Sequence, residues 1–235
     1  MVALPAPSDL ETLLLDAGNT LVFLDHVAVA DIVTSHGVPV DARALAAVEG
    51  EAKRRYEALM AAGVSHEEAW GLYLRALLEA AGVPAEAARA LVAPLRRAHD
   101  GFNLWRRVPE GLREALRRAR AAGLRVAVVS NSEGMLPQLF ERVGLAPMIE
   151  LVVDSHHEGV RKPDPELFRR ALVRLGVGPE RAVYLGDIPG VDVVGAHAAG
   201  IAAVLVDPLG FYPDHTASPR IESGAAWIEA LLERR

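Results

Sequence analysis

Acidic and small polar residues follow short apolar runs at several places in this sequence. Asp16 comes directly after the run Thr12–Leu15, Ser130 and Asn131 follow a second run, and Asp187 follows a third. A run that is apolar on both faces and stops at turn residues predicts a buried strand. Because chemistry in a parallel α/β sheet gathers at the carboxyl ends of its strands, we expect these four side chains to meet at one edge of a sheet.

Carboxylates in such places support two kinds of chemistry. Asp16 can attack phosphorus or an activated carbon and form a covalent intermediate that water then cleaves. Asp187 and Asp192, five residues apart, indicate a magnesium site, because Mg²⁺ prefers a few carboxylate ligands and keeps several waters. The chain has only two lysines, Lys53 and Lys162, so each is a candidate for a specific role.

Strand and helix signals alternate in the second half of the chain. We predict strands at 124–129, 149–153, 182–185 and 202–206, and helices at 109–122, 135–143, 164–175 and 191–199. This βα repeat predicts a Rossmann-like, doubly wound parallel sheet with helices on both faces. We expect residues 210–223 to be irregular and 225–232 to form a closing helix.

Residues 25–100 carry helix signals and no convincing strand. We predict helices at 26–35, 41–60, 65–81 and 84–99. Asp41 and Ser65 are placed to cap the second and third of them. We therefore expect a separate α-helical domain at 25–100, inserted into an α/β core domain that comprises 1–24 and 101–235.

The composition excludes several classes of function. A net charge of −6 over 235 residues argues against a nucleic-acid partner, which needs a basic face. The absence of cysteine excludes thiol nucleophiles and cysteine-type zinc sites. Since neither a signal segment nor a membrane-length apolar run is evident, we expect a cytoplasmic protein without a membrane partner. As a separate expectation, the protein is a monomer or a homodimer.

Four short stretches occur in a recognisable order. They are Asp16-Ala17-Gly18-Asn19-Thr20, Ser130-Asn131-Ser132, Lys162-Pro163-Asp164-Pro165, and Gly186-Asp187 with Asp192. In these stretches the sequence resembles the haloacid dehalogenase (HAD) superfamily, and the resemblance covers about residues 10–208. It implies that the βα repeat is the HAD core and that the helical insert is a cap, which closes over the site and governs substrate choice.

The resemblance also implies roles for the acidic residues. Asp16 is expected to be the nucleophile. With the backbone carbonyl of Gly18 and the carboxylate of Asp187 it is expected to bind Mg²⁺. Asp192 is expected outside the direct ligands, where it can hold Lys162, and Lys162 is expected to neutralise Asp16 and the substrate.

Small polar residues complete the implied site. Ser130 and Asn131 are expected to donate hydrogen bonds to the transferred group. Thr20 is expected at the substrate site, where its hydroxyl braces the loop. His156 and His157 are expected to be solvated, and Trp70 and Trp105 to pack in the interior.

Gly18 breaks the family pattern. The phosphatases of the superfamily usually have a second Asp there, two residues after the nucleophile, which acts as general acid and base. Asp25 or His26, in the following segment, can replace it. Asn19 suits a positive φ, and we expect that Gly18 can also adopt one.

Several functions remain open on this pattern. The leading interpretation is a magnesium-dependent phosphatase of a small phosphorylated metabolite, because Asp187 is retained. A haloacid dehalogenase or a phosphonate-cleaving hydrolase would also lack the second Asp, and the latter would need a cap lysine. We expect Lys53 to be an ordinary surface residue instead. The alternative outside enzymes is a binding protein on a decayed site.

Overall fold

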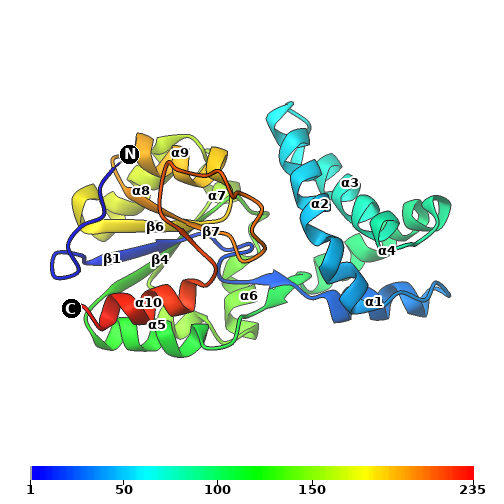
Figure 1. The fold of residues 1–235 in the computed structure, drawn as a ribbon, viewed down its shortest axis with the longest axis horizontal. Coiled ribbons are helices and arrows are strands. Elements are labelled where there is room, and N and C mark those ends of the chain that lie inside the picture. Colours follow the sequence, from blue (N-terminus) through cyan, green and yellow to red (C-terminus); the bar gives the residue numbers. More distant parts are fainter. Residues whose placement is uncertain (1) are drawn as a thin grey trace. The chain divides into compact units, whose positions relative to one another are not determined.

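The computed structural model describes residues 2–235, apart from the side chains of Ala61, His66 and Glu67. The chain forms two compact units (Figure 1). One comprises the residues up to Phe23 together with Trp105–Arg235, and the other comprises Leu24–Leu104. Within the described part of the chain, no helix is both long and apolar enough to cross a membrane.

A six-stranded parallel sheet forms the centre of the first unit. Its strand order is β5-β4-β1-β6-β7-β8. The strands are β1 (Thr12–Leu15), β4 (Arg125–Ser130), β5 (Leu151–Asp154), β6 (Ala182–Gly186), β7 (Ala202–Val206) and β8 (Arg220–Ile221). Leu15, the last residue of β1, pairs with Val128 on one side and with Leu185 on the other, so β4 ends two residues and β6 one residue beyond this level. The predicted parallel α/β class is confirmed.

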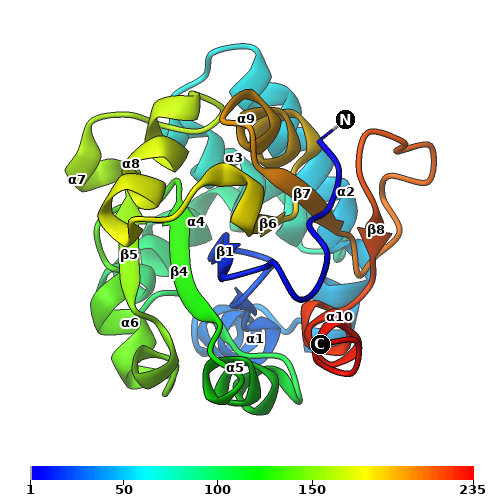
Figure 2. The ribbon, with the colours of Figure 1, turned by 90° about the vertical axis from the view of Figure 1, so that its left-hand side faces the viewer.

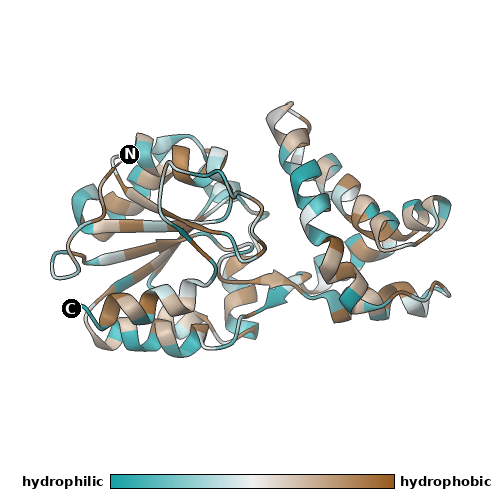
Figure 3. Ribbon diagram, viewed as in Figure 1, coloured by the Kyte–Doolittle hydropathy of each residue, from teal (hydrophilic) through white to brown (hydrophobic). Residues whose placement is uncertain are grey.

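Helices cover both faces of this sheet. They are α5 (Leu112–Ala121), α6 (Leu136–Arg142), α7 (Ser155–Glu158), α8 (Pro165–Leu175), α9 (Val194–Ala198) and α10 (Gly224–Leu232), with 3₁₀ turns at Ala146–Met148 and Pro179–Arg181. Figure 2 shows α8 and α9 on one face of the sheet and α5 and α10 on the other. The double cover explains why the strands are apolar on both faces, as the brown strands of Figure 3 show.

Alternate residues of each strand supply the two halves of the core. On the face covered by α8 and α9, Leu14, Val129 and Tyr184 pack with Phe168 in one buried cluster. The rings of Phe168 and Tyr184 meet edge to face at 4.9 Å. Tyr184 therefore lies in the core, with its hydroxyl directed at the polar groups described below.

Short elements account for the differences from the predicted order. β8 lies inside the segment predicted to be irregular, and α7 contains the two exposed histidines. The helix predicted at 191–199 begins as a π-helical turn, Pro189–Val193, before α9. β2 (Phe23–Leu24) and β3 (Trp105–Arg107) pair in a two-stranded sheet. Elements of two to four residues show no periodicity, so the sequence pattern does not reveal them.

The second unit is a bundle of four helices. They are α1 (His26–Ser35), α2 (Ala42–Ala61), α3 (His66–Ala80) and α4 (Ala85–Gly101). The predicted caps are confirmed, because Asp41 accepts a hydrogen bond from the backbone N–H of Arg43 and Ser65 accepts one from that of Glu68. The four helices predicted for residues 25–100 are therefore confirmed, and no strand lies between them.

A polar contact joins three helices of this bundle. The Glu49 carboxylate lies 2.9 Å from His26 Nε2 and accepts a hydrogen bond from the Tyr73 hydroxyl at 3.2 Å. Lys53, one turn further along α2, is only 8 % exposed and lies 4.0 Å from Glu57. The prediction of an ordinary surface lysine is wrong, since amphipathic spacing alone did not show that this position faces the interior.

Candidate active site

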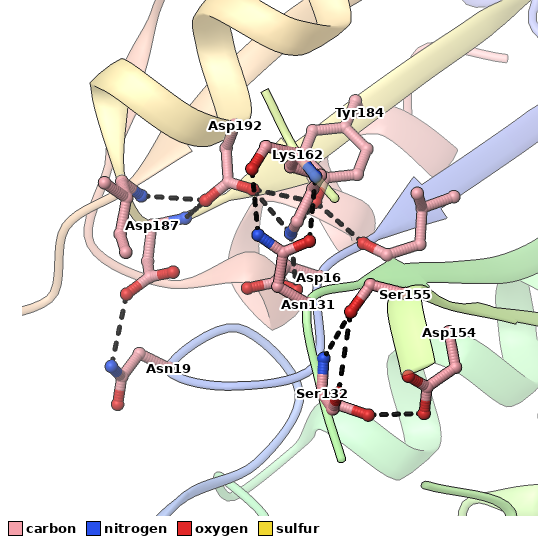
Figure 4. A network of polar contacts seen from close by, with 12 residues as sticks. Asp16, Asn19, Asn131, Ser132, Asp154, Ser155, Lys162, Tyr184, Asp187 and Asp192 are labelled. Carbon is pink, nitrogen blue, oxygen red and sulfur yellow. Dashed lines mark hydrogen bonds and ion pairs between the residues drawn. The ribbon is translucent and has the colours of Figure 1, made fainter. Parts of the chain in front are cut away.

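Three neighbouring strands end in predicted site residues at the carboxyl edge of the sheet, and Figure 4 shows two of these residues, Asp16 and Asp187. Asp16 follows β1, Ser130 is the last residue of β4, and Asp187 follows β6. The backbone N–H of Asp16 donates to the carbonyl of Leu185 at 2.8 Å, which carries the pairing of β1 with β6 up to the nucleophile position. All three side chains are buried.

Lys162 lies at the centre of the cluster. Its ammonium donates to Asp16 Oδ1 at 2.7 Å, to Asp192 Oδ1 at 2.7 Å and to the Tyr184 hydroxyl at 2.8 Å. An ammonium has three N–H groups, so these acceptors use all of them. The side chain of Lys162 is 2 % exposed and lies 2.7 Å from Asp16, while its predicted role in neutralising Asp16 and the substrate stays a prediction.

Asp192 is saturated by protein donors. Its Oδ1 accepts from Lys162 and Tyr184, and its Oδ2 accepts from the backbone N–H groups of Asp187 and Ile188 at 3.0 and 2.9 Å. A carboxylate offers about four acceptor positions, and here all are used. This supports the prediction that Asp192 holds Lys162 and is not a direct metal ligand.

The backbone of β6 makes room for Asp192. A Cβ on Gly186 would lie 2.4 Å from Asp192 Cγ, so only glycine lets this carboxylate fold back against the strand end. Asp192 lies in the π-helical turn Pro189–Val193, and its side chain is buried. The glycine before Asp187 therefore has a packing role that the sequence motif did not specify.

Tyr184 is the site residue that sequence reasoning missed. Its hydroxyl lies 2.9 Å from Asp192 Oδ1 and 3.0 Å from the carbonyl of Val129, besides accepting from Lys162. Burial, with Asp192 and Asp16 nearby, raises the pKa of Tyr184 well above its ordinary value, so the hydroxyl stays protonated. The available signal was a hydroxyl-bearing aromatic residue within an otherwise apolar strand.

Burial and charge oppose each other at Asp16. The pKa of Asp16 is raised to about 7: burial raises it most, Lys162 lowers it, and the charges of Asp192 and Asp187 raise it. For Lys162, burial lowers the pKa, but Asp16 and Asp192 outweigh this and raise it. The ammonium therefore stays charged beside the carboxylates of Asp16 and Asp192, and a cation near Asp16 would favour the ionised form of Asp16.

The donor set fits a small divalent cation. Carboxylate oxygens of Asp16, Asp187 and Asp192 all lie within 4.8 Å of one another. With Asp192 saturated, Asp16 and Asp187 are the two that can bind an ion. The hydroxyl of Thr20 is buried and has no hydrogen-bond partner in the protein, so the expectation that it braces the loop by a hydrogen bond is wrong. The residues present thus match the oxygen ligands of Mg²⁺.

A tight turn follows the nucleophile position. The carbonyl of Ala17 accepts from the N–H groups of Leu21 and Val22, both at 2.9 Å, and Asn19 N donates to the carbonyl of Val22 at 2.8 Å. Asn19 has φ 51°, as the sequence predicted. The expectation that Gly18 adopts a positive φ is wrong, and a Cβ there would meet no atom within 4 Å.

The side chain of Asn131 bonds to the backbone of Lys162. Its Oδ1 accepts from Lys162 N at 2.8 Å, and its Nδ2 donates to Lys162 O at 3.0 Å. This pair joins the loop after β4 to the segment that carries the ammonium. The second N–H of the Asn131 amide is not used in this pair. Substrate binding by Asn131 stays a prediction.

A second polar group braces the same loop. Ser132 Oγ donates to the buried Asp154 carboxylate, and Ser132 N donates to Ser155 Oγ at 3.2 Å. Asp154 ends β5 and also accepts from the N–H of His156 at 2.9 Å. These contacts hold the chain just after Ser130, without reaching the acidic cluster (Figure 4).

The two candidates for a replacement acid have structural partners in the helical unit. Asp25 caps α1 by accepting from the N–H of Ala28 at 3.1 Å, and His26 pairs with Glu49. Trp70 is buried in the same unit, as predicted, whereas Trp105 in β3 is half-buried. A catalytic role for Asp25 or His26 stays a prediction.

Known proteins resemble both the sequence and the fold. The family model for haloacid dehalogenase-like hydrolases matches residues 10–200. A phosphoserine phosphatase of Thermus thermophilus is 35 % identical, covering 87 % of this chain and 94 % of the relative. Haloacid dehalogenase-like hydrolase domain-containing protein 3 of Bos taurus is 32 % identical, covering 81 % of this chain and 79 % of the relative.

A solved structure shares the fold. The magnesium-bound YfnB of Bacillus subtilis has a TM-score of 0.71 and 19 % identity, covering 94 % of this chain and 98 % of its own. This likeness shows the fold, a parallel sheet covered by helices; in this chain a lysine bridges two aspartates at the carboxyl edge of that sheet. The chain belongs to the haloacid dehalogenase-like hydrolases and is an enzyme.

Proposed function

We propose that this enzyme is a magnesium-dependent phosphatase of a small phosphorylated metabolite, acting through an aspartyl-phosphate at Asp16. The observation that carries the proposal is the buried cluster in which Lys162 bridges Asp16 and Asp192 beside Asp187. The phosphatase name of the Thermus thermophilus relative supports phosphate monoesters as the substrate class.

Mg²⁺ would be held by the Asp16 and Asp187 carboxylates and the Gly18 carbonyl. When bound, the ion would supply positive charge against the negative charge of a phosphoryl group. The helical unit, Leu24–Leu104, is proposed as the cap that governs substrate choice.

The residues of this chain account for both halves of the reaction. In the first, a carboxylate oxygen of Asp16 attacks phosphorus, and the bond from phosphorus to the ester oxygen breaks, so the alcohol leaves and takes a proton from water. In the second, water attacks phosphorus and the bond to Asp16 breaks, which releases phosphate. Lys162 keeps Asp16 oriented and its charge balanced, while Ser130 and Asn131 donate to the phosphoryl oxygens.

The substrate class is tested with a panel of phosphate monoesters, with and without Mg²⁺. We expect phosphate release that requires Mg²⁺ and that Asp16→Asn abolishes. Halide release from a 2-haloacid without added metal would instead identify a dehalogenase. A borohydride-trapped adduct of phosphonoacetaldehyde at Lys53 would identify phosphonate cleavage, and inactivity with all the phosphate monoesters would overturn the proposed substrate class.

The metal ligands are tested by calorimetry. We expect Asp187→Asn to weaken Mg²⁺ binding strongly, because it replaces an anionic ligand by a neutral one. Ser132→Ala is the control, since Ser132 is half-buried at the same edge of the sheet but bonds to Asp154. Equal Mg²⁺ affinity in the native protein and Asp187→Asn would remove the metal assignment.

A further inference from the structure

The turn after the nucleophile makes a long-range contact with the proposed metal site. Asn19 Nδ2 donates to Asp187 Oδ2 at 3.1 Å, across 168 positions of sequence (Figure 4). The contact joins the loop after β1 to the loop after β6. Both loops carry a proposed magnesium ligand, and beyond the pairing of β1 with β6 this amide links them directly.

The backbone of the turn does not by itself require an amide. Asn19 is the one non-glycine residue of the described chain with φ in the left-handed region. Glycine adopts that region at no steric cost, so it would suit the turn at least as well. Asparagine usually tolerates the left-handed region because its side chain hydrogen-bonds to nearby residues of the same segment, but here the side chain bonds to Asp187, which is distant in sequence. The amide of Asn19 therefore serves to hydrogen-bond the Asp187 carboxylate and not to stabilise the turn.

Lys162 cannot take over this orienting role. Its three N–H groups already go to Asp16, Asp192 and Tyr184. Asp192 is also committed, since it accepts from the backbone of Asp187 and not from its side chain. A neutral donor such as Asn19 can hold one oxygen of Asp187 without competing with a cation for the negative charge.

We propose that Asn19 is a positioning residue for Mg²⁺: its amide orients the Asp187 carboxylate so that it can bind the ion together with Asp16. This rests on the proposed function. Partners that hydrogen-bond to metal ligands fix the orientation of those ligands, and their loss typically costs about 10- to 100-fold in metal affinity.

The test uses Asn19→Gly in the full-length protein, because this change keeps the left-handed turn and removes only the amide. Calorimetry is expected to show Mg²⁺ binding roughly 10- to 100-fold weaker than in the native protein. With EDTA present, the melting temperature is expected to change by less than about 4 °C. Excess Mg²⁺ is expected to restore kcat, a rescue that a general structural defect would not show.

Controls separate this proposal from the function on which it rests. Ser132→Ala is expected to bind Mg²⁺ with native affinity. Native affinity in Asn19→Gly, or a kcat that saturating Mg²⁺ does not restore, would overturn the role of Asn19 and leave the phosphatase proposal standing. A native protein that binds no Mg²⁺ would overturn both.

Discussion

At the residue scale, Gly18 is the position where this site differs most in chemistry from the family pattern. The position has open space and an ordinary φ, so a side chain there is compatible with the fold. A positioned carboxyl group that acts as general acid and base contributes roughly 10²- to 10⁴-fold to a rate. Without it, departure of a poor leaving group and attack of water on the aspartyl-phosphate are both expected to be slow.

This argument predicts a burst. The native enzyme with an activated aryl phosphate, whose leaving group needs no proton, is expected to release one equivalent of phenol quickly and then turn over slowly. Gly18→Asp is expected to raise the steady-state rate by shortening the life of the phosphoenzyme. Rapid-quench kinetics measures both, with Gly101→Asp as the control, because it adds the same charge in open space within the helical unit.

The contrary result is also informative. A folded, magnesium-bound Gly18→Asp that is no faster than native, together with a native enzyme that shows no burst, would mean that another group serves as the acid. The same two results would also be expected if phosphoryl transfer is not the reaction.

Tyr184 supports a second prediction at this scale. Tyr184→Phe removes one of the three acceptors of Lys162 and leaves a buried N–H unsatisfied, so the free energy of unfolding is expected to fall by roughly 1–3 kcal/mol. The loss of orientation at Lys162 is expected to lower kcat by roughly 10- to 100-fold. Tyr73→Phe removes a buried hydroxyl from Glu49 and is the control, expected to lose stability while kcat is kept. An unchanged kcat in Tyr184→Phe would refute the role.

At the scale of elements, the loop between β7 and β8 depends on one carboxylate. Asp207 follows β7 and accepts from the N–H groups of Phe211 and Tyr212 at 2.8 and 3.0 Å and from Arg220 at 3.1 Å. Burial alone would raise the pKa of Asp207, but these donors outweigh it and lower the pKa below its ordinary value. Asp207 thus ties the loop to the strand mainly in its ionised form.

The lowered pKa sets a pH dependence. The ionised carboxylate stabilises the fold fully above the pKa of an unfolded Asp, about 3.9, and this contribution is lost as the pH falls through the lower folded value. Asp207→Asn is therefore expected to lower the free energy of unfolding by roughly 1–3 kcal/mol at pH 7. Denaturation at several pH values should show the difference shrinking below about pH 4. A difference that stays constant down to pH 2 would contradict the assignment.

At the scale of the whole molecule, the proposed ligands lie in one of the two units. Asp16, Gly18 and Asp187 all belong to the α/β unit. A ligand that binds only the folded state stabilises it by RT ln(1 + [L]/Kd), about 2.7 kcal/mol at one hundred times Kd. Mg²⁺ should therefore stabilise the unit that contains the sheet.

Calorimetric melting tests this coupling. Saturating Mg²⁺ is expected to raise the melting temperature by roughly 5–10 °C relative to EDTA, and Asp187→Asn should abolish most of the shift. If the two units melt separately, only the transition of the α/β unit should move. Dehalogenation, which needs no metal, predicts no shift in either.

The sequence by itself determined the order of most elements and the positions of the acids. The apolar runs before Asp16 and Asp187 and the caps at Asp41 and Ser65 are local signals, since each depends on residues within a turn or a strand. Parallel pairing then follows from the βα repeat, and it brings the strand ends to one edge. The short β8 and α7 were missed because they lack a period.

Only the tertiary structure decided which groups touch. Lys162 reaches the hydroxyl of Tyr184, Asn131 bonds to the backbone of Lys162, and Asn19 bonds to Asp187. Lys53 lies inside the helical unit although its local pattern favoured the surface. These contacts depend on strand register and on the paths of loops that are distant in sequence. Neither can be predicted from the spacing of residues along a single segment.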